Sequence, residues 1–107
     1  MALMQINVVP LGTSSPSVGE FVASIVKQLQ REGAVYRLTD MGTEVEGAAA
    51  ELLALAARLH ERPFSKGCRR VLTQIVIDDR RDKKIGLGDK VASVNQRLAI
   101  EVDQRQP

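Results

Sequence analysis

Residues 69–77, RRVLTQIVI, decide the fold, because they carry the strongest β-strand pattern in the chain. One face of this strand carries Val71, Thr73, Ile75 and Ile77, and the other carries Leu72, Gln74 and Val76. Both faces are therefore largely apolar, and a strand of this kind needs cover on both sides. One layer of helices covers one side. We expect the second cover to come from another subunit.

The segments on either side of this strand alternate between strand and helix patterns. Apolar side chains at every second position predict strands, and apolar side chains at helical spacing predict helices. We expect strands at residues 3–10, 34–39, 43–47 and 69–77 and helices from Ser17 to Gly33, at 48–61 and at 87–98. Ser17 and Glu20 have the spacing of a capping box, and Gly33 is typical of a helix end. Pro63 is expected just beyond the second helix, and the polar tail 101–107 is expected to fray.

The order β-α-β-β-α-β followed by a helix predicts an α+β, ferredoxin-like sandwich. In this fold an antiparallel four-stranded sheet carries two helices on one face. The 107 residues form one domain, 1–107, with a modest core. A core this small, with few large side chains, favours stabilisation by oligomerisation. The third helix is expected to dock on a neighbour or on the sheet.

Aromatic residues make up 3% of the chain, namely Phe21, Tyr36 and Phe64. RNA-recognition domains of the same fold stack bases on rings of the central strands, and these strands offer none. We therefore exclude nucleic acid as a partner. The single cysteine, Cys68, indicates a reducing compartment. The N-terminus lacks the pattern of a signal peptide, and no apolar run approaches the length of a membrane span, so we expect a soluble, cytoplasmic protein.

The net charge is +2, distributed unevenly along the chain. The first 59 residues have a balance of −2 and the remaining residues a balance of +4. Basic residues of the second half alternate with acids in DDRRDKK, residues 78–84, which cancels much of their field. We therefore interpret this segment as a solvated, charged turn rather than as a nucleic-acid-binding surface.

The sequence shows no catalytic constellation and no metal site. His60 is the only histidine and has no second metal ligand at helical spacing. Cys68 lies beside Arg69 and Arg70, which can lower a thiol pKa, but no base partner is evident. Gly86 and Gly88 form a lone GxG motif, a weak signal for phosphate binding. We predict neither an enzyme nor a metalloprotein.

The loop LGTSSPS, residues 11–17, and the segment MGTEVEG, residues 41–47, each place Gly-Thr at a strand boundary. Hydroxyls and backbone amides at such boundaries are available to a ligand, and Glu44 and Glu46 add carboxylates that can accept from an amino group or pair with a cation. An equally weighted alternative is a solvated strand face in which Thr43 simply favours β structure. Residue types alone do not separate the two.

An ordered set of segments resembles the small thiamine-binding protein family (YkoF-like). These segments are PLGT, SVGEFVA, MGTEVEG, the HE pair that ends the second helix, RRVLTQIVIDDRRDKK and GLGDKVASV. The resemblance runs from about Asn7 to Val94 and rests on order and spacing rather than on one motif. It implies a ferredoxin-like fold, dimers that pair as tetramers, a ligand pocket between sheet and helices, and binding of thiamine or its hydroxymethylpyrimidine part.

The resemblance also implies roles for residues of this chain. The residues expected to contact the ligand are Thr13, Ser15, Phe21, Tyr36, Thr43, Glu44, Glu46 and Arg70. Glu46, or Glu44 if the register slips, would meet the thiazolium charge or the pyrimidine amine, and the hydroxyls would hydrogen bond. Phe21 or Tyr36 would form the apolar wall. Apart from the resemblance, the basic run gives a second interpretation of the ligand class, in which Arg70 and Arg80 would hold the phosphate of a phosphorylated vitamin or another anion. Strand alternation puts Thr43 and Glu46 on opposite faces, which conflicts with one pocket inside one chain.

The leading hypothesis is non-enzymatic binding of thiamine or a related pyrimidine by a homotetramer, with no required cofactor. The alternative is a structural or regulatory assembly domain with no dedicated vitamin ligand. A weak enzyme of vitamin metabolism ranks third, because no acid–base or nucleophile arrangement appears.

Overall fold

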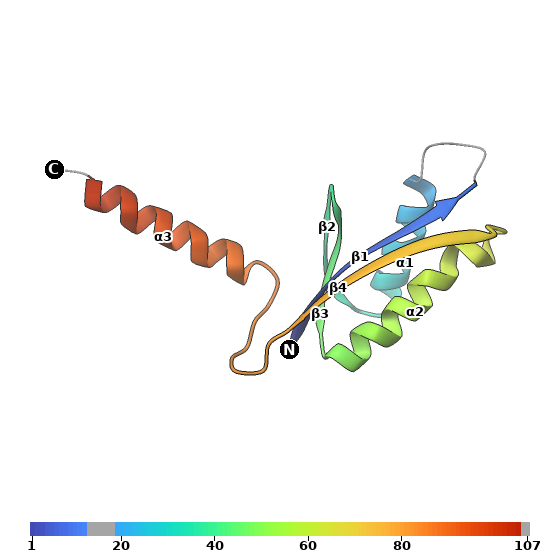
Figure 1. Cartoon of the computed structure of the whole chain (residues 1–107), viewed down its shortest axis with the longest axis horizontal. Coiled ribbons are helices and arrows are strands. Elements are labelled where there is room, and N and C mark those ends of the chain that lie inside the picture. Colours follow the sequence, from blue (N-terminus) through green and yellow to red (C-terminus); the bar gives the residue numbers. More distant parts are fainter. Residues whose placement is uncertain (13–18, 106–107) are drawn as a thin grey trace.

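The computed structural model describes the backbone of residues 1–12 and 19–105, and side chains as far as Glu101. Its elements are β1 (Ala2–Leu11), α1 (Gly19–Arg31), β2 (Val35–Thr39), β3 (Gly42–Gly47), α2 (Ala49–Ser65), β4 (Arg70–Asp79) and α3 (Asp89–Arg105) (Figure 1). Element types and order match those predicted from the sequence. The strands lie in the order β2-β3-β1-β4 with every neighbouring pair antiparallel, which is the ferredoxin-like arrangement.

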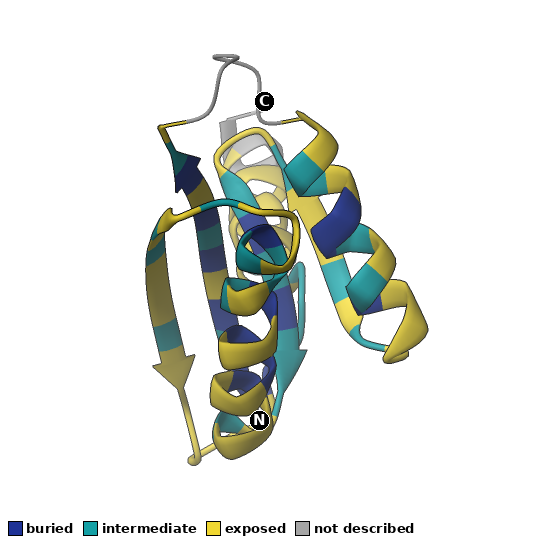
Figure 2. Ribbon diagram, turned by 90° about the vertical axis from the view of Figure 1, so that its right-hand side faces the viewer, coloured by how far each residue is buried: buried dark blue, intermediate teal, exposed yellow. Residues whose placement is uncertain are grey.

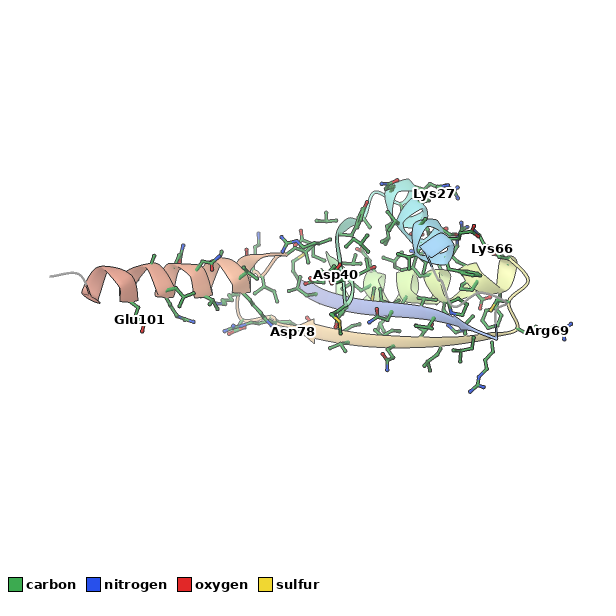
Figure 3. All side chains as sticks on the ribbon, turned by 90° about the horizontal axis from the view of Figure 1, so that it is seen from above. Lys27, Asp40, Lys66, Arg69, Asp78 and Glu101 are labelled. Atoms are coloured by element: carbon green, nitrogen blue, oxygen red, sulfur yellow. The ribbon has the colours of Figure 1, made fainter. Side chains whose placement is uncertain are left out.

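The hydrophobic core lies between the sheet and helices α1 and α2. Side chains of β1 alternate, so Met4 and Ile6 are buried while Gln5 is exposed. Leu29 of α1 and Leu59 of α2 close the core from the helix side, each with no exposed surface. Figure 2 shows these buried residues gathered where the helices face the strands. The opposite side of the sheet, here called the open face, has no described element over it (Figure 3).

One helix end matches the sequence-based prediction, and another differs from it. Gly33 has a φ of 66°, and the Ala34 N–H donates to the Leu29 carbonyl at 3.0 Å, which is the glycine-ended helix predicted. Pro63, expected beyond α2, lies inside it and is buried. The helix runs only to Ser65 after it, and the Lys66 and Cys68 N–H groups both donate to the Pro63 carbonyl. Ser17 of the expected capping box lies outside the described residues.

Helix α3 is longer than predicted and does not lie on the sheet of its own chain. It begins at Asp89 and continues to Arg105, through most of the tail that was expected to fray. Figure 1 shows it projecting away from the sheet and the other helices, which accounts for the elongated dimensions of 62 × 31 × 21 Å. From Asp89 to Glu101 every side chain except Ser93 is exposed. Among the described residues, no helix is long and apolar enough to cross a membrane.

Candidate functional site

A pocket opens beside the C-terminal part of β1, which β3 does not reach. β1 pairs with β4 along its whole length, from Ala2 to Leu11, but with β3 only as far as Ile6. Beyond Ile6 no described strand continues along that edge of β1. The gap, bounded by the β2–β3 turn and by α1, forms a cavity of about 200 Å³ that we call the hairpin pocket. Its lining combines residues of β1, β2 and β3 with Val22 and Ile25 of α1.

Three polar side chains that line the hairpin pocket have no hydrogen-bond partner in the part of the chain that the structure describes. They are Asn7 of β1, Asp40 of the turn and Thr43 of β3. Thr43 as a whole is only 6% exposed, but no buried side-chain nitrogen or oxygen of the described residues lacks a partner, so its hydroxyl is accessible from the cavity. Asn7 lies over Gly42, where an added Cβ would come within 2.9 Å of the Asn7 amide. Glycine at position 42 therefore gives the Asn7 amide its room.

The rest of the pocket wall is apolar, supplied mainly by Val22 and Ile25 of α1 and by Leu38 of β2. A small apolar cavity with a few converging polar groups is the usual form of a small-molecule site. An amide, a hydroxyl and a carboxylate together can accept from an exocyclic amine and donate to a ring nitrogen. The arrangement can thus orient a flat, polar heterocycle.

Of the three polar residues that line this cavity, the sequence-based prediction included Thr43 but not Asn7 or Asp40. Asn7 is a polar residue within the apolar strand segment INVV, and that interruption was a usable signal. Asp40 gave no signal of its own, because Asp-Met-Gly is an ordinary turn sequence. Its place in the pocket depends on how far β3 extends, which residue types do not reveal.

Glu44 and Glu46 lie on the open face, on the other side of the sheet from Thr43, as strand alternation predicted. Glu44 is opposite Arg37 of β2, and Glu46 is opposite Val35. The Leu87 N–H donates to Glu46 Oε2 at 2.8 Å. The two glycines on either side of Leu87 permit this approach, since a Cβ at Gly86 would lie 2.8 Å from that oxygen and one at Gly88 would lie 2.9 Å from Arg37 Nη2.

This contact explains the GxG motif without a phosphate. The amide that a phosphate would use already donates to a carboxylate. Asp89 Oδ2 accepts from the Gly86 N–H at 2.8 Å, which closes the turn that leads into α3. The motif therefore fixes the point from which α3 projects.

A Gly86→Ala variant is expected to lose about 1 kcal/mol of unfolding free energy, because the Leu87–Glu46 hydrogen bond must break to admit the methyl group. Urea unfolding measures the loss. In a Glu46→Ala background the same substitution should cost much less, since the obstructing oxygen is gone. Equal costs in both backgrounds would contradict this role of Glu46.

A second, larger cavity of about 600 Å³ lies at the other edge of β1, near the start of β4. We call it the basic pocket. Its cationic lining residues are Lys66, Arg69 and Arg70, and Phe21 of α1 supplies an apolar surface. Of the residues predicted to contact ligand, Phe21 and Arg70 thus lie here rather than with Thr43.

The remaining candidates are placed outside both cavities or outside the described chain. Tyr36 packs against the core, and its hydroxyl accepts from Gln30 Nε2 at 3.1 Å. His60 is held by Thr73, with 2.7 Å between Nδ1 and Oγ1, and packs edge-on against Phe64. Thr13 and Ser15 lie outside the described residues. Over residues 1–12 and 19–101 no group of His, Cys, Asp and Glu is arranged to hold a metal ion.

The Cys68 thiol faces the backbone, although Cys68 lines the basic pocket. It donates to the carbonyls of Arg70 at 3.3 Å and of Leu11 at 3.8 Å. These contacts tie the start of β4 to the end of β1. They give the thiol a structural partner at this edge of the pocket.

Arg70 and Arg80, both considered as phosphate ligands, lie at opposite ends of β4. The strand has 10 residues, which separates the two arginines by roughly 30 Å, too far to share one phosphate. Arg80 also pairs with Asp82 at 2.6 Å, and this hydrogen bond lowers the pKa of Asp82 to about 2. The Arg81 guanidinium likewise lowers the pKa of Asp79. Both carboxylates stay ionised at neutral pH and neutralise their arginines.

Comparison with known proteins gives consistent relatives along nearly the whole chain. A family profile described as "Thiamine-binding protein" matches residues 4–95. The UPF0045 protein YqgV of Bacillus subtilis (strain 168) is 47% identical over 102 residues, 92% of this chain and 98% of that protein. A UPF0045 protein of Staphylococcus xylosus is 41% identical over 102 residues, covering 92% and 95%.

Solved structures share the fold. A hypothetical protein from Methanocaldococcus jannascii superposes with a TM-score of 0.78 at 23% identity, covering 88% of this chain and 95% of that one. A Thermotoga maritima protein named "putative thiamine biosynthesis/salvage protein" gives 0.71 at 22% identity, covering 87% and 97%. With the family profile spanning most of the chain and the Bacillus relative 47% identical, the chain belongs to the thiamine-binding protein family.

Proposed function

We propose that this protein binds thiamine or hydroxymethylpyrimidine in the hairpin pocket and does not convert it chemically. We further propose that it does so in the cytoplasm, as a homo-oligomer, without a cofactor. The observation that carries the proposal is the set of three unpartnered polar side chains, Asn7, Asp40 and Thr43, that line one cavity beside the β2–β3 turn. The family to which the chain belongs is named for thiamine, which supports this choice of ligand.

The chemistry of an aminopyrimidine suits these side chains. Its exocyclic amine needs an acceptor, which the Asp40 carboxylate or the Asn7 carbonyl supplies, and its ring nitrogens need donors, which the Thr43 hydroxyl and the Asn7 amide supply. Asp40 also gives a counter-charge for the thiazolium of thiamine. Val22, Ile25 and Leu38 take the place of the aromatic wall that was expected from Phe21 or Tyr36.

The absence of turnover is proposed from the residues that line the hairpin pocket. Asp40 is the one ionisable side chain in its described lining, and no nucleophile with an adjacent base lies there. Binding, buffering or delivery of the ligand needs no nucleophile and no catalytic base.

Isothermal titration with thiamine and with hydroxymethylpyrimidine tests the proposal. We expect saturable heat with at least one of the two. A Thr43→Val variant should bind about tenfold more weakly, because a hydrogen bond to the ligand is lost. Its stability should be unchanged or higher, since the hydroxyl has no partner among the described residues of the unliganded chain. No heat with either ligand up to millimolar concentration would refute the proposal.

A matched pair of variants on β1 tests whether Asn7 belongs to the site. Asn7 and Gln5 are amide side chains on the same strand, two residues apart and therefore on the same face, but only Asn7 lines the hairpin pocket. Asn7→Ala is expected to weaken binding several-fold, whereas Gln5→Ala should leave the dissociation constant unchanged. Equal losses in both variants would show that the ligand does not bind in the hairpin pocket, which Gln5 does not line.

Two apolar surfaces support a homo-oligomer. On the open face, Leu72 and Val76 of β4 are 51% and 63% exposed. Along α3, the exposed side chains Val91, Val94 and Leu98 recur at helical spacing and form one stripe. β4 also has no strand along its second edge in the described chain, and such a long apolar edge favours pairing. A second copy of the chain would cover these surfaces.

The same surfaces also support the alternative function, an assembly domain with no dedicated ligand. Light scattering with and without thiamine, combined with thermal unfolding, separates the two. Ligand binding to the folded state raises the unfolding temperature, so a shift supports the proposal. An oligomer that forms without any ligand-dependent shift supports the assembly domain.

A further inference from the structure

We propose that the basic pocket is an anion subsite that receives the phosphate groups of a phosphorylated form of the ligand held in the hairpin pocket. The inference rests on the proposed function for the identity of the ring, but the anion subsite stands on observations of its own. These are the composition of the pocket lining, the charges left unneutralised there, and the position of the pocket next to the hairpin pocket.

The described lining of the basic pocket contains cationic side chains and no acidic ones. Lys66, Arg69 and Arg70 line it, and its described lining contains no carboxylate. None of the three has an ion-pair or side-chain hydrogen-bond partner in the described chain. By contrast, Arg58, Arg80, Arg81 and Lys90 each pair with an acid. The end of the molecule that carries the basic pocket therefore keeps its positive charge, and such a concentration of unpaired charge attracts anions.

The shape of the pocket suits a group larger than a single ion. Its volume of about 600 Å³ is in the range of organic-ligand sites. Gly12 and Gly67 lie on its wall with φ values of 73° and 90°, and nothing comes within 4 Å of a Cβ built on either of them. The wall is thus open at both glycines, and the ring of Phe21 gives the cavity an apolar surface beside the cations.

The cations contribute in different ways. Figure 3 shows Arg69 at the tip of the loop before β4 with its side chain directed away from the body, so we assign it a long-range attraction rather than a direct contact. Lys66 ends α2, and Arg70 begins β4 directly opposite Leu11. These two are the residues to which we assign the anion.

The two pockets share the end of β1 and the start of α1. Val9 lines the hairpin pocket and Leu11 lines the basic pocket, only about 7 Å apart along the strand. The consecutive residues Phe21 and Val22 line the basic and hairpin pockets respectively. One ligand with a polar ring at one end and phosphate groups at the other matches this pair of sites.

Titration of the full-length chain with thiamine, thiamine diphosphate and pyrophosphate alone tests the inference. We expect the diphosphate to bind about tenfold more tightly than thiamine, and this advantage to shrink as salt is raised. A Lys66→Gln/Arg70→Gln variant should lose the advantage while its affinity for thiamine stays unchanged. The control Lys27→Gln/Arg31→Gln removes the same charge from exposed positions on α1 and should keep the advantage. Urea unfolding of each variant checks that it is folded.

The outcomes separate this inference from the proposed function. If thiamine binds but phosphate groups add no affinity, or if the double variant keeps the advantage, the anion subsite is refuted and the hairpin pocket stands. If thiamine gives no heat but pyrophosphate binds the wild type and not the Lys66→Gln/Arg70→Gln variant, the anion subsite stands and the proposed function fails. Equal losses in both double variants would show nonspecific attraction and would also refute the subsite.

Discussion

Replacement of Leu59 by alanine is expected to lower the free energy of unfolding by about 2–5 kcal/mol. Leu59 lies on the inner face of α2 with no exposed surface, packed in the core formed with β1 and α1. The variant loses the burial of the leucine side chain and leaves a cavity that the neighbouring side chains fill only in part. In a chain of 107 residues, a loss of this size is a large share of the total stability.

Leu53 on the same helix provides the control for this prediction. It is 54% exposed, so Leu53→Ala removes the same atoms without opening a cavity, and alanine is at least as good a helix former. We expect its unfolding free energy to stay within about 0.5 kcal/mol of the wild type in urea titrations. Equal losses in the two variants would mean that α2 does not pack against the sheet by the face that carries Leu59.

Secondary structure and strand faces followed from the sequence because both depend on local periodicity. The alternation of Thr43 and Glu46 was predicted and is observed, since neighbouring side chains on a strand point to opposite faces wherever the strand lies. Gly33 ended α1 as predicted for the same local reason. Pro63 was misplaced because a proline in the last turn of a helix removes only a hydrogen bond near an end, which tertiary burial offsets.

The grouping of site residues did not follow from the sequence, because it depends on where strands stop relative to one another. Phe21 and Thr43 were expected in one pocket, but they line two different cavities near the end of β1. Asp40 entered the hairpin pocket only because β3 leaves the edge of β1 at Ile6. Conversely, Glu46 and the distant Gly86 meet across 40 residues of chain, a contact that periodicity does not encode.

A Val76→Asp variant is expected to be a smaller species than the wild type in light scattering, because it places a charge on the surface where we propose that subunits meet. Val76 is 63% exposed in the single chain and lies on the open face, opposite Gln5 of β1. If a second copy covers it, each wild-type valine contributes roughly 1.5–3 kcal/mol of burial, and a two-fold interface contains the position twice. An aspartate must instead be buried without a partner or remain in water, which separates the subunits.

Leu53→Asp is the control for dissociation, since it adds the same charge to the helix-covered side of the molecule, at a position of similar exposure. It should keep the mass of the wild type, whereas Leu72→Asp, on the same face of β4 as Val76, should behave like Val76→Asp. If Val76→Asp keeps the wild-type mass, the subunits do not meet through this face. The stripe of Val91, Val94 and Leu98 on α3 would then be the remaining apolar surface, and Leu98→Asp would test it directly. Thiamine binding by a dissociated Val76→Asp variant would further show that the hairpin pocket is complete within one chain.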